Sequence, residues 1–180
     1  FDFLMRKKRP YSLRYRLSNE SSRVISGYNG EDAWLRVETA SKVTITSLQA
    51  EEALALREQA RFDSPLFRAT ERSGYDIEFA ERTTLNDRSV YVVAIYERGK
   101  DVFKYYVDVV TAHVVRVDRV GDNGEIKFQT LYRDFKEVDG FPFAHEIETR
   151  VNGETTSLAK VNVIEVNPGL LSFYFEKPNR

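Results

Sequence analysis

The sequence contains no cysteine, and this absence removes several kinds of chemistry at once. Disulfide frameworks, zinc sites with cysteine ligands and thiol nucleophiles all require that residue. No apolar stretch approaches the roughly 20 residues that a membrane-spanning helix needs. The formal net charge is -1, which gives no general attraction to nucleic acid. We therefore expect neither an integral membrane protein nor a nucleic-acid-binding protein.

The short motifs of common enzymes are also missing. The sequence has neither a G-x-S-x-G nucleophile elbow nor a G-x-x-x-x-G-K-[ST] phosphate loop. Neither His113 nor His145 has the partner spacing of a zinc site on a helix, so we expect both to be packed or hydrogen-bonded. Glu146 and Glu148 share a strand face, and two nearby carboxylates could hydrolyse glycosides. They lie opposite the apolar alternation, however, which favours solvated side chains and a protein that is not an enzyme.

What the sequence does contain is a series of short segments with bulky apolar residues at every second position. The clearest lies at residues 11–17, where Tyr11, Leu13, Tyr15 and Leu17 alternate with serine and arginine. We count about ten such strands, which is many for one open sheet and favours strong curvature or closure. The other segments lie at residues 24–28, 33–37, 75–79, 90–96, 103–107, 115–117, 126–135, 143–151 and 156–166.

Turn residues separate these segments. Asn29-Gly30 predicts a type I′ hairpin turn between residues 24–28 and 33–37. The pairs at 123–124, 139–140 and 152–153 punctuate the later strands in the same way. Residues 90–96 are apolar on both alternations, so this strand should be covered on both faces. The aromatic residues after Pro168 predict a terminal segment held against the fold.

The period changes from two to that of a helix after Leu48. Strong helix formers follow, with Glu51 and Glu52 in the first turn facing the positive end of the helix dipole. A second short helix is expected after Ser64 and should stop near Gly74. Residues 48–73 therefore predict a helical flap beside the strands.

Two groups of side chains leave alternatives open. The basic run at residues 6–9 is either a solvated strand end before Pro10 or a contact for anionic lipid headgroups or an acidic partner. We favour the solvated strand end for Arg6, Lys7 and Lys8. The aromatic side chains on the apolar alternations either fill a core or line a cavity, and the sequence does not choose between these.

Two segments carry a resemblance to a known family. Residues 8–15 (KRPYSLRY) and 22–34 (SRVISGYNGEDAW) resemble the core of the LolA-like outer-membrane lipoprotein-sorting proteins, which read K-R-P, a strand, and an I-V-S-D-G-K-T-x-W hairpin. Residues 60–66, 106–108 and 135–143 resemble a broader group of this family. The chain departs from the pattern at Tyr28, which replaces the usual acid, at residues 38–48, and in having Trp34 as its single tryptophan.

The resemblance implies a fold, a location and a function. The fold would be mainly β, a highly curved antiparallel sheet forming an incomplete barrel of about 10–11 strands with a helical lid. We expect one such domain over residues 1–180, with a further helix, a strand and any export signal before Phe1. By this resemblance the protein is a periplasmic carrier of lipoprotein acyl chains, or of another lipid, in a Gram-negative bacterium. The alternative is a non-transporting sensor or interaction domain of the same fold.

The resemblance also suggests partners and site residues. Lipid or lipoprotein acyl chains would be the cargo, membrane-associated transport or acceptor proteins would be further partners, and no cofactor is implied. In the family, the arginine of K-R-P reaches the lid helices and helps hold the cavity shut, so the resemblance implies Arg9 as the lid latch here. The expected cavity wall consists of Phe3, Met5, Leu13, Tyr15, Phe79, Phe103 and Tyr105. The expected lid residues are Leu56, Phe62, Leu66 and Phe67.

Overall fold

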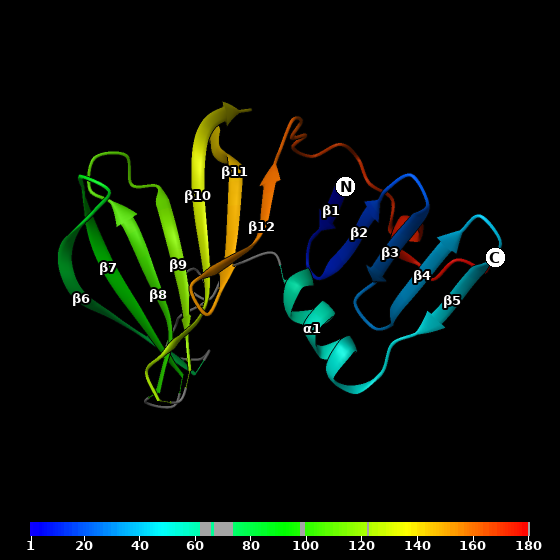
Figure 1. Ribbon diagram of the computed structural model, residues 1–180, viewed down its shortest axis with the longest axis horizontal. Helices are drawn as coiled ribbons and strands as arrows, with labels where there is room; N and C mark the ends of the chain where they lie inside the picture. The colour runs from blue at the N-terminus through cyan, green and yellow to red at the C-terminus, as the bar shows by residue number, and fades with distance from the viewer. Residues whose placement is uncertain (62–65, 67–73, 98–99, 122, 180) are drawn as a thin grey trace. The chain divides into compact units, whose positions relative to one another are not determined.

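The computed structural model describes residues 1–61, 66, 74–97, 100–121 and 123–179. Within these residues the chain forms twelve β-strands, one α-helix and one 3-10 helix (Figure 1). It divides into two compact units, each with one antiparallel sheet. The first unit comprises residues 1–64 and 167–180, and the second comprises residues 65–166. No helix in the described ranges is long and apolar enough to cross a membrane.

The first unit contains a five-stranded sheet in which each strand pairs with the next along the chain. Its order is β1-β2-β3-β4-β5, and every pairing is antiparallel. The strands are β1 (Asp2–Lys8), β2 (Ser12–Ser18), β3 (Ser22–Tyr28), β4 (Ala33–Thr39) and β5 (Val43–Ser47).

The second unit contains a seven-stranded sheet of the same meander type. Its order is β12-β11-β10-β9-β8-β7-β6, again antiparallel throughout. The strands are β6 (Tyr75–Leu85), β7 (Arg88–Glu97), β8 (Lys100–Asp108), β9 (Val114–Val120), β10 (Ile126–Val138), β11 (Phe141–Val151) and β12 (Glu154–Lys160). The mainly β fold expected from the sequence is confirmed, with two sheets in place of one.

The helix α1 (Ala50–Ala60) packs on one face of the five-stranded sheet. Leu56 and Ala60 are four residues apart and so lie on one side of the helix. Both are buried against Leu13, Tyr28 and Ala33, which the strand register places side by side. The predicted helix after Leu48 is therefore confirmed, and its apolar stripe forms a core with β2, β3 and β4.

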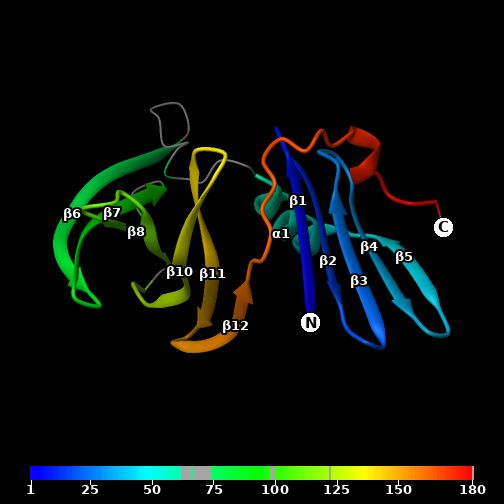
Figure 2. The same ribbon diagram turned by 90° about the horizontal axis from the view of Figure 1, so that it is seen from above.

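The C-terminal segment crosses the opposite face of the same sheet (Figure 2). The 3-10 helix η1 (Ser172–Phe175) places Phe175 over Trp34, and neither residue is exposed. Trp34 donates a hydrogen bond from Nε1 to the Phe175 carbonyl over 3.0 Å. Gly27 leaves room for the indole, because a Cβ atom there would lie 2.2 Å from its ring. The prediction of a terminal segment held by its aromatic residues is confirmed.

The turn predictions hold in part. Asp139-Gly140 and Asn152-Gly153 each form a two-residue turn with positive φ at both positions, as type I′ geometry requires. The Asn29-Gly30 prediction is right about the hairpin but wrong about the turn, since four residues separate β3 from β4. Only Gly30 of this pair has a positive φ, while the Asn29 side chain accepts hydrogen bonds from the backbone of Glu31 and Asp32.

Three further expectations need correction. Strand β5 was not expected, although Val43 and Ile45 alternate there with Thr44 and Thr46. The last strand ends at Lys160 and does not continue to residue 166. On β7, Val90, Val92, Ala94 and Ile95 are buried, but Tyr91 remains 39% exposed, so the strand is not fully covered on both faces. The expected second helix lies mostly outside the described residues.

Candidate functional site

The four site residues expected in the first unit share one face of its sheet. Met5 pairs directly with Tyr15, and Phe3 and Leu13 lie two positions away on their own strands. The rings of Phe3 and Tyr15 lie 5.0 Å apart between centroids. Leu13 is fully buried beneath α1, whereas Phe3 and Met5 are 43% and 45% exposed. The helix therefore covers one end of this apolar row and leaves the other end accessible.

The flap residues are only partly described. Leu56, on α1, packs in the core between this helix and the five-stranded sheet, and Leu66 is half-buried. Phe62 and Phe67 lie outside the described residues. Arg9, the expected latch, lies exposed in the turn between β1 and β2.

A contact between the sheet and the end of α1 is made by Lys7, which sequence reasoning missed. Its Nζ donates a hydrogen bond to the Arg61 carbonyl over 2.8 Å, and burial lowers the pKa of this lysine. The interpretation of residues 6–8 as a solvated strand end is therefore wrong. Arg6 contacts Tyr174 and Lys8 donates to Ser172 on the other face. The signal was present in the alternation, because Lys7 falls on the same face as Phe3 and Met5.

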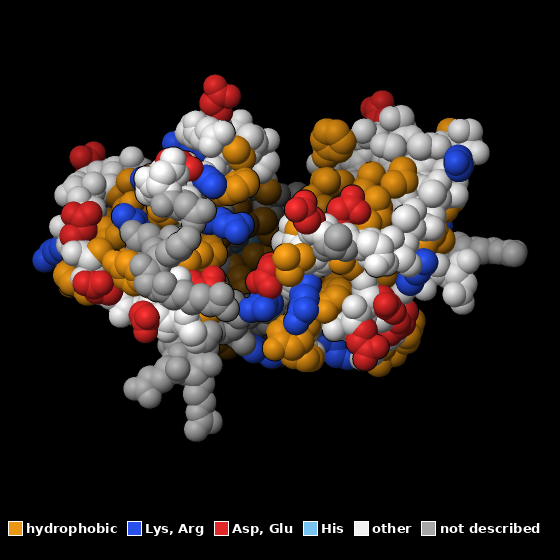
Figure 3. Space-filling model, turned by 90° about the horizontal axis from the view of Figure 1, so that it is seen from below, with side chains coloured by type: hydrophobic (Ala, Val, Ile, Leu, Met, Phe, Trp, Pro, Cys, Tyr) orange, Lys and Arg blue, Asp and Glu red, His pale blue; other side chains and the backbone are white. Residues whose placement is uncertain are grey.

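The three site residues expected in the second unit also share one face. Phe79 pairs with Val93, which pairs with Tyr105, and Phe103 lies two positions from Tyr105 on β8. Phe79 is 60% exposed, whereas Tyr105 is buried. We call this the aromatic face; it consists of Ile77, Phe79, Tyr91, Val93, Ile95, Phe103, Tyr105 and Tyr132. Hydrophobic side chains reach the surface of both units in Figure 3.

A hollow of about 590 Å³ lies near one end of the seven-stranded sheet. This volume falls within the range of about 300–1,000 Å³ that is common for small-molecule sites. His113 stacks on Phe135 at its wall, with ring centroids 4.3 Å apart, so the expectation of a packed histidine is confirmed. The lining residues are Leu85, Asn86, Arg88, Thr111, His113, Val115, Leu131, Tyr132, Arg133, Asp134 and Phe135.

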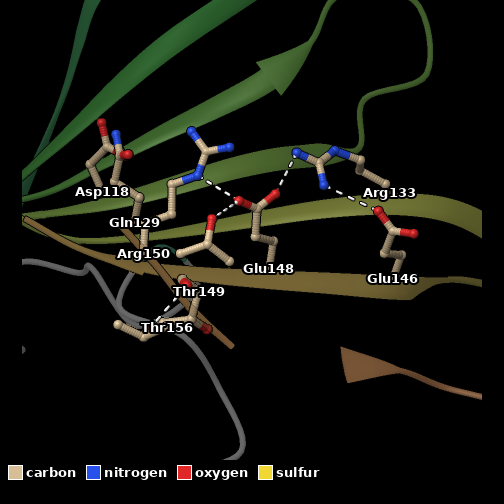
Figure 4. A network of polar contacts seen from close by, with 9 residues as sticks. Asp118, Gln129, Arg133, Glu146, Glu148, Thr149, Arg150 and Thr156 are labelled. Carbon is tan, nitrogen blue, oxygen red and sulfur yellow. Dashed lines mark hydrogen bonds and ion pairs between the residues drawn. The ribbon is translucent and has the colours of Figure 1, made fainter. Parts of the chain in front are cut away.

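The face opposite the aromatic face carries a charged network (Figure 4). Glu148 accepts hydrogen bonds from Arg150 Nε and Thr155 Oγ1, each over 2.6 Å, and pairs with Arg133 Nη2 at 2.7 Å. Arg133 also pairs with Glu146 at 3.1 Å. The expectation of a solvated Glu148 is wrong, because β11 lies between two strands that supply its partners and the residue is only 7% exposed.

Glu148 does not fit the role of the acid in a glycosidase. The hydrogen bonds from Arg150, Thr155 and Arg133 lower the pKa of Glu148 to about 2. A glycosidase needs one carboxyl group with a raised pKa to protonate the leaving group.

The other histidine, His145, lies with Nδ1 2.7 Å from the Val161 carbonyl oxygen, and its expected hydrogen-bonded role is confirmed.

Acid should weaken the second unit through Glu148. Its pKa falls from 4.5 to about 2 on folding, so the carboxylate stabilises the fold above pH 4.5. This contribution is lost as the pH falls toward 2. We therefore expect Glu148→Gln to lower the melting temperature by several degrees at neutral pH, and expect the difference from wild type to vanish near pH 2. Circular dichroism melts across this range measure it.

Glu146→Gln is the matched control for that experiment. Glu146 lies on the same face of the same strand, but its side chain is 30% exposed and, within the described part of the chain, it forms an ion pair with Arg133 alone. Its effect at neutral pH should be smaller, because exposed ion pairs contribute little. A difference between wild type and Glu148→Gln that stays constant down to pH 2 would contradict the prediction.

Comparison with known proteins supports the fold. No protein-family model matches the sequence, and no curated protein matches it. Among solved structures, a DUF1329 family protein from Desulfovibrio piger aligns with a TM-score of 0.56 and 12% identity, over 92% of this chain and 75% of that one. A protein described as an outer membrane lipoprotein-sorting protein domain, from Vibrio parahaemolyticus, aligns with a TM-score of 0.50 and 12% identity, over 97% and 86% of the two chains.

A LolA superfamily protein from Nitrosomonas europaea also aligns, with a TM-score of 0.45 and 12% identity over 91% of this chain and 84% of that one. The first two similarities place the chain in a structural class of mainly β proteins that includes a lipoprotein-sorting domain. The resemblance inferred from residues 8–34 is thereby confirmed at the level of the fold.

Proposed function

We propose that this protein binds the acyl chains of a lipid or lipoprotein and carries them through the periplasm toward the outer membrane. The observation that supports this most is the set of large apolar side chains left partly exposed on one face of each sheet. Phe3 and Met5 in the first unit, and Ile77, Phe79 and Tyr91 in the second, are between 39% and 60% exposed. Exposed apolar patches on a water-soluble surface commonly mark binding sites.

The energetics of cargo binding fit such surfaces. Each methylene group removed from water contributes about 0.8 kcal/mol, so an acyl chain of roughly 16 carbons gains on the order of 12 kcal/mol before ordering costs. An acyl chain therefore needs a protein partner to cross an aqueous compartment. The same strength would retain the cargo, so a carrier also needs a way to release it.

The end of α1 is the element that we assign to release. Leu56 and Ala60 hold the helix over Leu13, while the Lys7 ammonium group binds the carbonyl of Arg61 at its end. A hydrogen bond to a charged group contributes only about 1.5–3 kcal/mol. Such a latch can open without unfolding the sheet. Arg9, two residues further along the chain, keeps the latch role implied by the family resemblance, and membrane-associated acceptor proteins are the partners we propose.

Purified protein should contain or accept lipid. Solvent extraction followed by mass spectrometry identifies a co-purified lipid, and displacement of a fluorescent fatty acid measures binding. A protein that is consistently empty and does not displace the probe would contradict the carrier proposal. That outcome would favour the alternative, a non-transporting sensor or interaction domain of the same fold.

Phe79→Glu should weaken binding of the fluorescent fatty acid by about tenfold or more. The reason is that burying one large apolar side chain against a ligand contributes about 1.5–3 kcal/mol, which a carboxylate replaces with a desolvation cost. Leu158→Glu is the matched control, because Leu158 is 54% exposed, against 60% for Phe79, and lies on the opposite face of the same sheet. Equal binding by the two folded variants would contradict the assignment of the aromatic face.

A further inference from the structure

A second pocket, of about 220 Å³, lies on the face of the five-stranded sheet opposite α1. The register brings its residues together: Arg16 on β2 lies opposite Leu4 on one side and Ile25 on the other, and Ile25 lies opposite Arg36. Residues directly opposite in a ladder project to the same face. The lining residues are Leu4, Arg6, Arg14, Arg16, Arg23, Ile25, Arg36, Glu38 and Tyr174.

The positive charge of this pocket is only partly balanced. Five arginines line it with one carboxylate, that of Glu38. Both oxygens of Glu38 are already engaged, one by Arg23 Nη1 at 3.1 Å and the other by Arg36 Nε at 2.6 Å. Arg6 and Arg14 lie directly opposite each other, an arrangement that destabilises a sheet when the charges are alike. The pocket therefore holds excess positive charge that an anion would neutralise.

Tyr174 holds two of these arginines in place without neutralising them. Arg14 Nη1 donates to the Tyr174 carbonyl over 2.8 Å, and Arg6 Nη1 donates to its hydroxyl group. Both guanidinium groups also lie over the tyrosine ring, at 4.5 and 5.0 Å from its centroid. Carbonyl, hydroxyl and ring carry no net charge. The C-terminal segment thus forms a fixed wall that orients cations toward the pocket.

Arg16 is the residue that points most directly to a missing ligand. Its Nε atom is buried and has no hydrogen-bond partner among the described residues. A buried donor without a partner is costly, and a guanidinium group cannot lose its proton to avoid that cost. An anion bound in the pocket would accept this hydrogen bond and lower the repulsion among the arginines.

We propose that this pocket binds a phosphate group, as inorganic phosphate or as part of a lipid headgroup. Guanidinium groups match the geometry of phosphate oxygens and form charge-assisted hydrogen bonds with them. The volume is smaller than the roughly 300–1,000 Å³ of typical sites for drug-sized ligands, which suits a small anion. The pocket lies on the other side of the sheet from Phe3 and Met5, so this inference does not depend on acyl-chain binding.

Titration calorimetry with inorganic phosphate at low salt tests the site. Wild type should bind phosphate, and Arg16→Gln should bind it about tenfold more weakly, because one charge-assisted hydrogen bond is lost. Arg119→Gln, which removes an exposed arginine in the second unit, should bind as wild type does. Arg16→Lys keeps the charge and should bind more tightly than Arg16→Gln. Absence of binding by wild type, or equal binding by these two folded Arg16 variants, would overturn the proposal.

Vesicle binding separates the two sources of phosphate. If a lipid headgroup is the ligand, vesicles containing phosphatidic acid should sediment with wild type, less with Arg16→Gln, and inorganic phosphate should compete. If free phosphate is the ligand, calorimetry should show binding while the vesicles leave the protein in solution. Either result supports a phosphate site. Calorimetry that shows no binding of inorganic phosphate contradicts both versions, whether or not the vesicles sediment with the protein.

Discussion

Phe175→Ala should lower the free energy of unfolding of the first unit by about 3–5 kcal/mol, the usual cost of removing a buried phenylalanine side chain. Phe175 is fully buried against Trp34, on the face of the sheet that α1 does not cover. The loss would leave a cavity above the indole ring. It would also loosen the segment whose carbonyl accepts the indole hydrogen bond.

The protein supplies its own probe and control for this experiment. Trp34 is the single tryptophan, so its fluorescence during denaturant unfolding reports on the first unit. Phe173→Ala removes the same side chain from the same short helix, but Phe173 is 71% exposed. That change should stay within about 0.5 kcal/mol of wild type. Equal destabilisation by the two variants would show that Phe175 does not anchor the C-terminal segment.

The sequence predicted the strands well where hydrophobic alternation and turn residues agreed. Strand β2 shows a clear period of two, and the turns at 139–140 and 152–153 carry residues that tolerate positive φ. The turn at Asn86-Asp87 was missed, although both residues have positive φ. Neither is glycine, and asparagine and aspartate adopt this conformation less often.

The polar contacts were much harder to predict. Glu148 has the alternation of a solvated residue, and its burial depends on arginines from its own strand and from β10. The proposed phosphate pocket likewise needs Arg16 on β2 and Arg36 on β4 to lie on one face of the sheet, on either side of Ile25 on β3. The alternation of residues along a strand indicates which face a side chain occupies. It does not indicate what covers that face. Contacts between distant segments, such as Arg14 with Tyr174, leave no pattern in the sequence.

The second large effect is expected at Asp118, which is fully buried on the face of the seven-stranded sheet that lies opposite the aromatic face. Arg116 binds both of its oxygens, at 2.7 and 2.6 Å, and Gln129 donates to it over 3.3 Å. Arg116 also lies over the ring of Tyr106, with 4.5 Å between its guanidinium carbon and the ring centroid. Burial and the Asp118 carboxylate raise the pKa of Tyr106, which keeps this ring neutral beside the ion pair.

Asp118→Ala should destabilise the second unit by about 3 kcal/mol, at the low end of the range for breaking a buried ion pair. The low end applies because the Arg116 side chain is 18% exposed and can recover some hydration. The cost arises from the unpaired guanidinium group and not from the lost attraction alone. Denaturant unfolding followed by far-ultraviolet circular dichroism measures it, since Trp34 lies in the first unit.

The double variant Arg116→Met, Asp118→Leu distinguishes the two sources of that cost. Replacing both partners by apolar side chains of similar size leaves no buried charge, and such exchanges are often neutral or stabilising. The double variant should therefore be more stable than Asp118→Ala, although it carries more substitutions. If both proteins lose the same free energy, the packing around Asp118 and not its charge sets the stability of this sheet.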